Sequence, residues 1–206
     1  MKAVLFDLDN TLIDFTGMKN AAIKEATRSM LKAGLNIPFK EAYKKLNKVY
    51  WEDIESDTAI TDFLRRLEKG DDRILAAGIN GYLRGKLANT KPVEGAIEAI
   101  KRFKERGLKV AVITDAPGLK AWQRLNLMGM DDLFDVVITF DDTGKKKPDE
   151  APFRAALKKL GVTSEEAVMV GDWYERDIEG AKRLGMKTVL MGPAGVKTFK
   201  ELEKVL

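Results

Sequence analysis

Residues 6–12 read FDLDNTL and continue the apolar run KAVLF of residues 2–6. Residues 4–8 predict a short buried strand that aspartates bring to an end. Two carboxylates, those of Asp7 and Asp9, stand one residue apart at this end. Alternation along a regular strand directs both side chains to the same side, where like charges repel. The pair therefore calls for a metal ion, a bound proton or solvent between the two side chains.

The composition is that of a globular protein of mixed charge. The chain has 206 residues, of which 45% are hydrophobic and 33% charged, and its net charge is only +4. This length suits one medium domain, or a core domain with an insertion. No basic stripe indicates nucleic-acid binding, no apolar run is long enough to span a membrane, and the N-terminus does not resemble a signal peptide. We therefore expect a cytoplasmic protein that binds neither nucleic acid nor membrane.

Two residue types are missing, and their absence limits the chemistry. The chain contains no Cys and no His. Disulfides, thiolate nucleophiles and Cys-based zinc sites are excluded, and so are the commonest general base and the commonest metal ligand. Any catalysis must use carboxylates, Lys, hydroxyl groups and a hard metal ion that prefers oxygen ligands.

The pattern of apolar residues changes twice along the chain. Residues 15–88 have helical spacing throughout and predict about four helices. After Lys91 and Pro92, strands alternate with helices, which indicates a parallel sheet covered on both faces. The predicted fold is α/β, with a core formed by residues 1–14 and 92–206 and a helical insertion at residues 15–91. The further strands are predicted at residues 108–114, 135–140, 167–172 and 187–191.

Polar residues gather where the predicted strands end. Ligands of open parallel sheets bind beyond these carboxyl ends, so the side chains are expected to share one rim. Each also has a structural interpretation, as a helix cap, a strand-end hydroxyl or a solvated basic run. Their convergence from four strands is the stronger signal. The residues are Asp7, Asp9 and Thr11; Thr114 and Asp115; Asp141, Asp142 and the run KKKPDE at 145–150; and Asp172 and Asp177.

These motifs resemble those of the haloacid dehalogenase-like superfamily of phosphatases. FDLDNTL resembles the family's D-x-D-x-T motif, and Thr114 its second motif. Lys147, followed by Pro148 and by a Phe six residues on, resembles the third motif, and GDWYERD at residues 171–177 the fourth. The insertion resembles the family's small α-helical (C1-type) cap on a Rossmann-like core, as in phosphoglycolate phosphatases and β-phosphoglucomutases.

One position departs from the family's pattern, and another leaves two residues as candidates. Asp115 stands where the family often has Asn, and it adds negative charge near the expected phosphate site. Lys146 is the alternative to Lys147 as the phosphate-binding lysine, because three lysines are consecutive.

The resemblance implies a role for each site residue. Asp7 is the expected nucleophile, and Asp9 the expected acid and base. Thr114 and Lys147 are expected to bind the phosphoryl group, with Thr11 and Asp115 beside it. Mg²⁺ is the expected cofactor; its expected ligands are Asp7, Asp172 and the main-chain carbonyl of Asp9, and Asp177 either touches the metal or orients Lys147.

The expected function is Mg²⁺-dependent hydrolysis of a small phosphate monoester through an aspartyl-phosphate. A phosphomutase and a receiver-like signalling protein are alternatives. A 2-haloacid dehalogenase is a further alternative, which the presence of Asp9 disfavours. We expect a monomer that acts on a small phosphorylated metabolite. Phe15, Thr16, Met18 and Lys19 follow the first motif, and they are candidates either for contacting the leaving group or for the core of the insertion.

Overall fold

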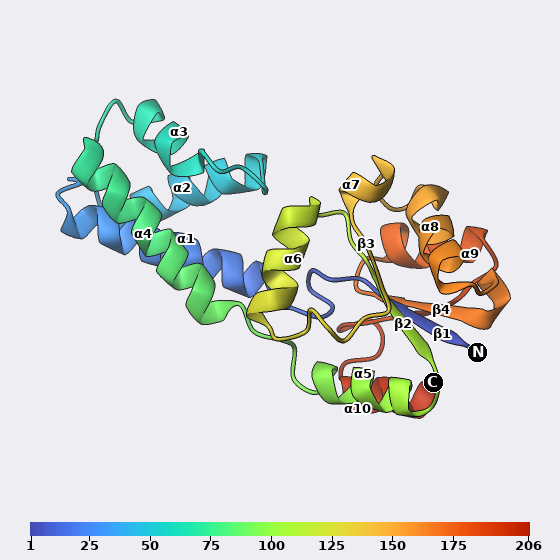
Figure 1. Cartoon of the computed structure of the whole chain (residues 1–206). Coiled ribbons are helices and arrows are strands. Elements are labelled where there is room, and N and C mark those ends of the chain that lie inside the picture. Colours follow the sequence, from blue (N-terminus) through green and yellow to red (C-terminus); the bar gives the residue numbers. More distant parts are fainter. The chain divides into compact units, whose positions relative to one another are not determined.

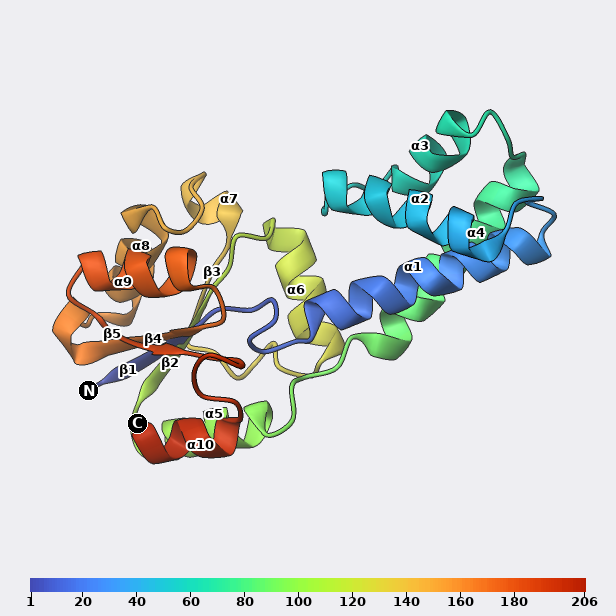
Figure 2. The same cartoon turned by 180° about the vertical axis from the view of Figure 1, so that it is seen from behind.

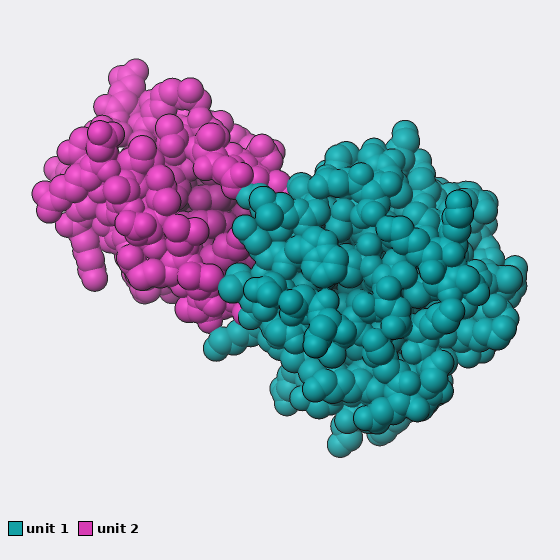
Figure 3. Space-filling model, viewed as in Figure 1, with its two compact units in different colours: residues 1–14, 91–206 teal, residues 15–90 magenta.

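The computed structural model describes residues 1–206 and divides into two compact units (Figures 1 and 3). Unit 1 comprises Met1–Asp14 and Lys91–Leu206, and unit 2 comprises Phe15–Thr90. The sequence analysis ends the helical insertion at residue 91, whereas unit 2 of the structure ends at Thr90. None of the helices combines the length and apolar character needed to cross a membrane.

Unit 1 is built on a five-stranded sheet in the order β3-β2-β1-β4-β5. All four strand pairings are parallel, so the predicted parallel sheet is confirmed. The first strand along the chain lies at the centre, where both faces and both edges are covered, which explains its fully apolar sequence. The strands are β1 (Ala3–Phe6), β2 (Lys109–Ile113), β3 (Val136–Ile138), β4 (Ala167–Gly171) and β5 (Lys187–Leu190).

Helices cover both faces of this sheet, as predicted (Figures 1 and 2). Alternate residues of β1 enter different cores: Leu5 packs in the cluster that contains Phe153 of α8, whereas Phe6 contacts the rings of Phe103 on α5 and Phe199 on α10. The helices are α5 (Ala96–Glu105), α6 (Gly118–Leu127), α7 (Phe140–Thr143), α8 (Glu150–Leu160), α9 (Glu179–Arg183) and α10 (Phe199–Val205), with a 3-10 turn η1 (Ser164–Glu166) and a π-helical turn η2 (Tyr174–Ile178).

The central strand is shorter than predicted. Strand β1 ends at Phe6, where residues 4–8 were expected, because the chain turns sharply beyond it. Asn10 adopts a positive φ of 63°, and the amide of Ile13 donates to the carbonyl of Leu8. Asn tolerates this left-handed conformation better than most residues. Asp7 and Asp9 thus both lie beyond the end of the strand, and the regular alternation expected of them does not apply.

Unit 2 is entirely helical, as predicted. Helices α1 and α4 lie against each other, and two glycines of α4 allow close contact: a Cβ at Gly85 would lie 2.7 Å from Cα of Ala22, and one at Gly81 would lie 2.8 Å from the carbonyl of Glu25. A core that includes Ile23, Leu46 and Phe63 holds the unit together. The helices are α1 (Phe15–Lys32), α2 (Phe39–Glu52), α3 (Ala59–Arg66) and α4 (Asp72–Asn89).

Candidate active site

The motif residues converge at the carboxyl edge of the sheet. Asp7 immediately follows β1, and its amide donates to the carbonyl of Val170 on β4. Thr114 follows β2, and its amide donates to the carbonyl of Ile138 on β3. Because β1 lies between β2 and β4, the ends of these three strands place Asp7, Thr114 and Asp172 at one rim.

Lys147 is the cation at the centre of this rim. Its ammonium lies 2.5 Å from Oδ1 of Asp7 and 2.7 Å from Oδ1 of Asp177, and it donates to the carbonyl of Ile113 at 2.9 Å. Burial opposes a charge on Lys147, but the two carboxylates outweigh it and raise the pKa of the ammonium. Lys147 therefore stays charged, and it brings the first, third and fourth motifs together.

The neighbouring lysine does not enter the site. Lys146 is exposed, and its ammonium lies over the ring of Phe140, 5.5 Å from its centre. The geometry thus favours Lys147 over Lys146 as the phosphate-binding lysine.

Three carboxylates, those of Asp7, Asp172 and Asp177, are close enough to share a metal ion. One oxygen from each lies within 4.8 Å of the others. Burial raises the pKa of Asp7, and the nearby charge of Asp177 adds to this, while Lys147 opposes it. Burial and Asp177 likewise raise the pKa of Asp172. Grouped, desolvated carboxylates of this kind are stabilised by a hard cation, and oxygen-only donors suit Mg²⁺. The donor set therefore fits the metal ion expected from the sequence.

Asp177 contacts both the cation and the backbone of its own turn. Its Oδ2 accepts a hydrogen bond from the amide of Trp173 at 3.0 Å. A Cβ at Gly171 would lie 2.3 Å from the same oxygen, so only glycine fits at the end of β4. The π-helical turn η2 holds Asp177 inward, where it is 1% exposed.

Asp9 has a cationic partner that the sequence analysis missed. Nη1 of Arg124, on α6, lies 2.7 Å from Oδ2 of Asp9. Arg124 is buried together with Ala121 and Leu125 on the same face of the helix. A charged residue at the i+3 position of an apolar helical stripe was the signal that could have revealed it. The two aspartates of the first motif thus each have their own cation, Lys147 for Asp7 and Arg124 for Asp9.

Asp115 is neutralised as well. Its Oδ1 accepts the amide of Lys147 at 2.8 Å, and its Oδ2 lies 3.2 Å from Nη1 of Arg176. The guanidinium of Arg176 also stacks on Trp173, 4.1 Å from the ring centre. The negative charge of Asp115 is therefore balanced by an arginine from the fourth motif.

The two threonines of the predicted site are buried. The hydroxyl of Thr114 accepts a hydrogen bond from the amide of Ala116 at 3.2 Å, which agrees with the interpretation of Thr114 as a strand-end hydroxyl. This bond leaves the hydroxyl proton available for donation. The Thr11 hydroxyl, near Asp172, acts to lower the pKa of that carboxyl group.

Two other strand-end aspartates serve the backbone. Asp141 accepts the amide of Gly118 at the start of α6, and Asp142 accepts the amide and hydroxyl of Thr139. These contacts agree with the structural interpretation of strand-end aspartates.

Three of the four candidates in unit 2 are buried, and Thr16 is exposed. Phe15 and Met18 are buried, and the ammonium of Lys19 donates to the carbonyl of Ile54 at 2.6 Å. The same ammonium lies 5.1 Å from the ring centre of Tyr50 and 5.6 Å from that of Tyr82. The contacts of Lys19 fit the interpretation of this residue as part of the core of the helical unit.

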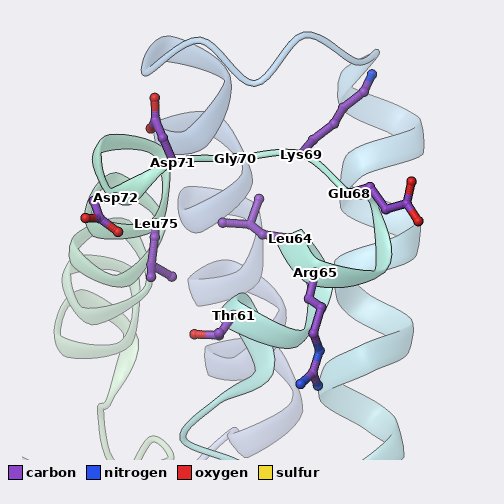
Figure 4. A pocket seen from close by; sticks show the side chains of 9 residues that line it. All are labelled: Thr61, Leu64, Arg65, Glu68, Lys69, Gly70, Asp71, Asp72 and Leu75. Atoms are coloured by element: carbon purple, nitrogen blue, oxygen red, sulfur yellow. The ribbon is translucent and has the colours of Figure 1, made fainter.

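Unit 2 also has a hollow of about 400 Å³ between α3 and the start of α4 (Figure 4). Charged side chains of both signs surround it, and Figure 4 shows those of Lys69 and Asp71 pointing away from one another. None of the predicted site residues lines this hollow.

Comparisons with known proteins show the family of the chain. Residues 1–185 match the haloacid dehalogenase-like hydrolase family. A glyceraldehyde 3-phosphate phosphatase of Methanocaldococcus jannaschii is 40% identical over 191 residues, which are 92% of this chain and 84% of that protein. The protein of the same name from Pyrococcus abyssi is 37% identical and covers 92% of this chain and 80% of its own length.

A solved structure has a similar fold over the full length of the chain. The crystal structure of a phosphatase of the same family from Thermococcus onnurineus has a TM-score of 0.71 and 26% sequence identity. The match covers 100% of this chain and 97% of that one.

Proposed function

This chain belongs to the haloacid dehalogenase-like hydrolases, and we propose that it hydrolyses a small phosphate monoester through a phosphoryl group carried on Asp7. The observation that carries this proposal is the cluster of Asp7, Asp172, Asp177 and Lys147. It joins a buried carboxylate, a fixed ammonium and a group of oxygen donors suited to a divalent cation. Transfer of a phosphoryl group requires three elements: a nucleophile, a cation that binds the phosphoryl oxygens, and neutralisation of the negative charge.

The first half of the reaction transfers the phosphoryl group to Asp7. A carboxylate oxygen of Asp7 forms a bond to phosphorus while the bond from phosphorus to the ester oxygen breaks. Asp9 donates a proton to that oxygen, so that the product leaves as an alcohol. Lys147 and the Thr114 hydroxyl bind the phosphoryl oxygens while negative charge shifts among them.

The second half of the reaction restores the enzyme. Asp9, now a carboxylate, accepts a proton from a water molecule, whose oxygen forms a bond to phosphorus. The bond between phosphorus and Asp7 breaks, and inorganic phosphate leaves. One residue thus serves as acid in the first half and as base in the second.

Asp7, Asp172 and the carbonyl of Asp9 would hold Mg²⁺, which Asp177 would support from beside Lys147. When bound, the ion offsets the repulsion between the attacking carboxylate and the phosphate dianion. Asp177 remains within reach of both the donor group and Lys147, so the two roles expected for it are compatible.

The proposed substrate is a phosphorylated metabolite of about three carbons, with glyceraldehyde 3-phosphate as the first candidate. The support is the 40% and 37% identity with two proteins named for that activity, over most of each chain. We assign Phe15–Thr90 as the cap of the enzyme, the role that an inserted helical block has in this family, and this assignment favours small substrates over macromolecules.

A phosphate-release screen tests the proposal. The panel contains glyceraldehyde 3-phosphate, phosphoglycolate and hexose phosphates, each with Mg²⁺ and with excess EDTA. We expect Mg²⁺-dependent release, fastest with the three-carbon ester. Conversion of a sugar phosphate into its isomer without release would point to a phosphomutase. Stable phosphorylation without turnover would point to a receiver-like protein, and either result would contradict the proposal.

A further inference from the structure

Arg124 is a buried cation that the proposed reaction does not yet use. Its side chain is 4% exposed and lies on α6, and the carboxylate it contacts belongs to the loop after β1, 115 residues away in sequence. Burying a guanidinium is costly unless a well-placed partner compensates for the lost hydration. Only a few of the 36 Lys and Arg side chains in this chain of 206 residues are buried. The burial of Arg124 therefore suggests a specific role.

The contact has a defined geometry. Nη1 of Arg124 donates to Oδ2 of Asp9 at 2.7 Å. The helix that carries Arg124 is anchored at its start, where the amide of Gly118 donates to the carboxylate of Asp141 at 2.8 Å. Ala121 and Leu125, on the same face as Arg124, are fully buried and fix this face of the helix against the core. A guanidinium is planar and rigid, so it restricts the direction of the carboxylate more strongly than a flexible ammonium does.

We propose that Arg124 is a positioning residue for the acid–base step, an inference that rests on the proposed function. Arg124 holds Oδ2 of Asp9, and the proton moves through Oδ1. As the bond between phosphorus and the ester oxygen breaks, the proton passes from Oδ1 to that oxygen; in the second half Oδ1 receives the proton of the attacking water. A carboxyl group free to rotate would spend much of its time misdirected, and misplacement by about 1 Å costs about 100-fold in rate.

This role predicts a dependence on the leaving group. An alkoxide, as from glyceraldehyde 3-phosphate, must be protonated to leave, whereas the acetate of acetyl phosphate is a stable anion and leaves without a proton. The constant kcat/KM reports steps up to the departure of the leaving group, so it isolates the acid step from the later base step. Loss of correct positioning should therefore lower kcat/KM for the alkyl ester and spare it for acetyl phosphate.

The experiment compares wild type with Arg124→Leu on these two substrates at saturating Mg²⁺. We expect kcat/KM for glyceraldehyde 3-phosphate to fall about 10- to 100-fold, and that for acetyl phosphate to stay within about threefold of wild type. Arg124→Lys, which keeps the charge but loses the planar fork, should show the same selectivity with a smaller loss, and it serves if the Leu variant does not fold. Arg102→Leu, which removes an exposed arginine paired with Glu203, is the matched control and should change neither constant.

A double-mutant cycle completes the test. Once Asp9 is replaced in Asp9→Asn, Arg124→Leu should lower kcat/KM for glyceraldehyde 3-phosphate no further, because there is no acid left to position. Equal losses on both substrates, no loss on either, or additive losses in the cycle would overturn the inference. If wild type releases phosphate from neither substrate, the proposed function fails instead, and this inference fails with it.

Discussion

The ammonium of Lys147 lies 2.5 Å from Oδ1 of Asp7, although 140 residues separate them in sequence. The contact joins the loop after the central strand to the KKKP run, and Oδ1 of Asp177 lies 2.7 Å from the same ammonium. A cation thus stands beside the proposed nucleophile before any phosphate arrives. This reduces the repulsion that a second anion would meet, and it makes the stability of the site depend on the same charges as the chemistry.

Lys147→Met should destabilise the protein as well as inactivate it. Asp7 and Asp177 would keep their buried carboxylates without the ammonium, and breaking a buried ion pair costs about 3–5 kcal/mol. Chemical denaturation in Mg²⁺-free buffer measures the change in the free energy of unfolding, and added Mg²⁺ should restore part of it. Lys146→Met is the matched control, since Lys146 is exposed. Similar losses in the two variants would contradict this account of the cluster.

Mg²⁺ should bind more tightly as the pH rises. Burial raises the pKa values of Asp7 and Asp172, so more of each carboxyl is protonated in mildly acidic buffer than for an exposed aspartate. A metal ion requires the ionised form, and binding therefore releases protons. Calorimetric titration at about pH 5.5 and about pH 7.5 should show weaker binding at the lower pH, with proton release visible on changing the buffer. An affinity independent of pH would be inconsistent with protonated, desolvated ligands.

Asp9→Asn should separate metal binding from turnover. The side chain of Asp9 is paired with Arg124. The cluster of carboxylates suited to a metal ion is formed by Asp7, Asp172 and Asp177 instead. We expect kcat for glyceraldehyde 3-phosphate to fall about 10²–10⁴-fold, the usual scale of acid–base catalysis. The dissociation constant for Mg²⁺ should change little. Unchanged turnover would remove Asp9 from the acid–base role.

Arg176 should affect the KM for the phosphate ester only because residue 115 is an aspartate. Its guanidinium lies 3.2 Å from Asp115, and Arg176→Met would leave that charge near the phosphate. For a partly exposed pair, we expect the KM for the phosphate ester to rise about two- to fivefold. Asp115→Asn should be tolerated, and the double variant should recover a KM close to that of wild type. A double variant as impaired as Arg176→Met would show that the arginine acts in another way.

Much of the fold and of the site could be predicted from local sequence. Parallel strands buried on both faces give uninterrupted apolar runs, which the sequence shows. Because the carboxyl ends of such strands share one edge, the order of the strands along the chain was enough to expect Asp7, Thr114 and Asp172 to lie together. The helical character of Phe15–Thr90 followed from its spacing in the same way. The sheet order and the end of β1 at Phe6 depend on contacts between distant segments, which periodicity does not encode.

The cations of the site were harder to predict than its carboxylates. Which of three consecutive lysines turns inward depends on backbone geometry, so the sequence favoured Lys147 over Lys146 only through the spacing of the motif to Pro148 and Phe153. Arg124 looked like an ordinary residue of an amphipathic helix, and its pairing with Asp9 spans 115 positions. Charge pairing across such separations leaves no local pattern, apart from a charged residue on an apolar stripe.

The central claim is that Asp7 carries the phosphoryl group, and trapping that group tests it most directly. Asp9→Asn should still accept phosphate from acetyl phosphate, since acetate leaves without a proton, but it should lack the base that activates water. We therefore predict that this variant, mixed with acetyl phosphate and Mg²⁺, quenched in acid and mapped by peptide mass spectrometry, carries close to one phosphoryl group on Asp7. Phosphorylation at any other residue, or phosphate release from a protein that is never modified at position 7, would contradict the account.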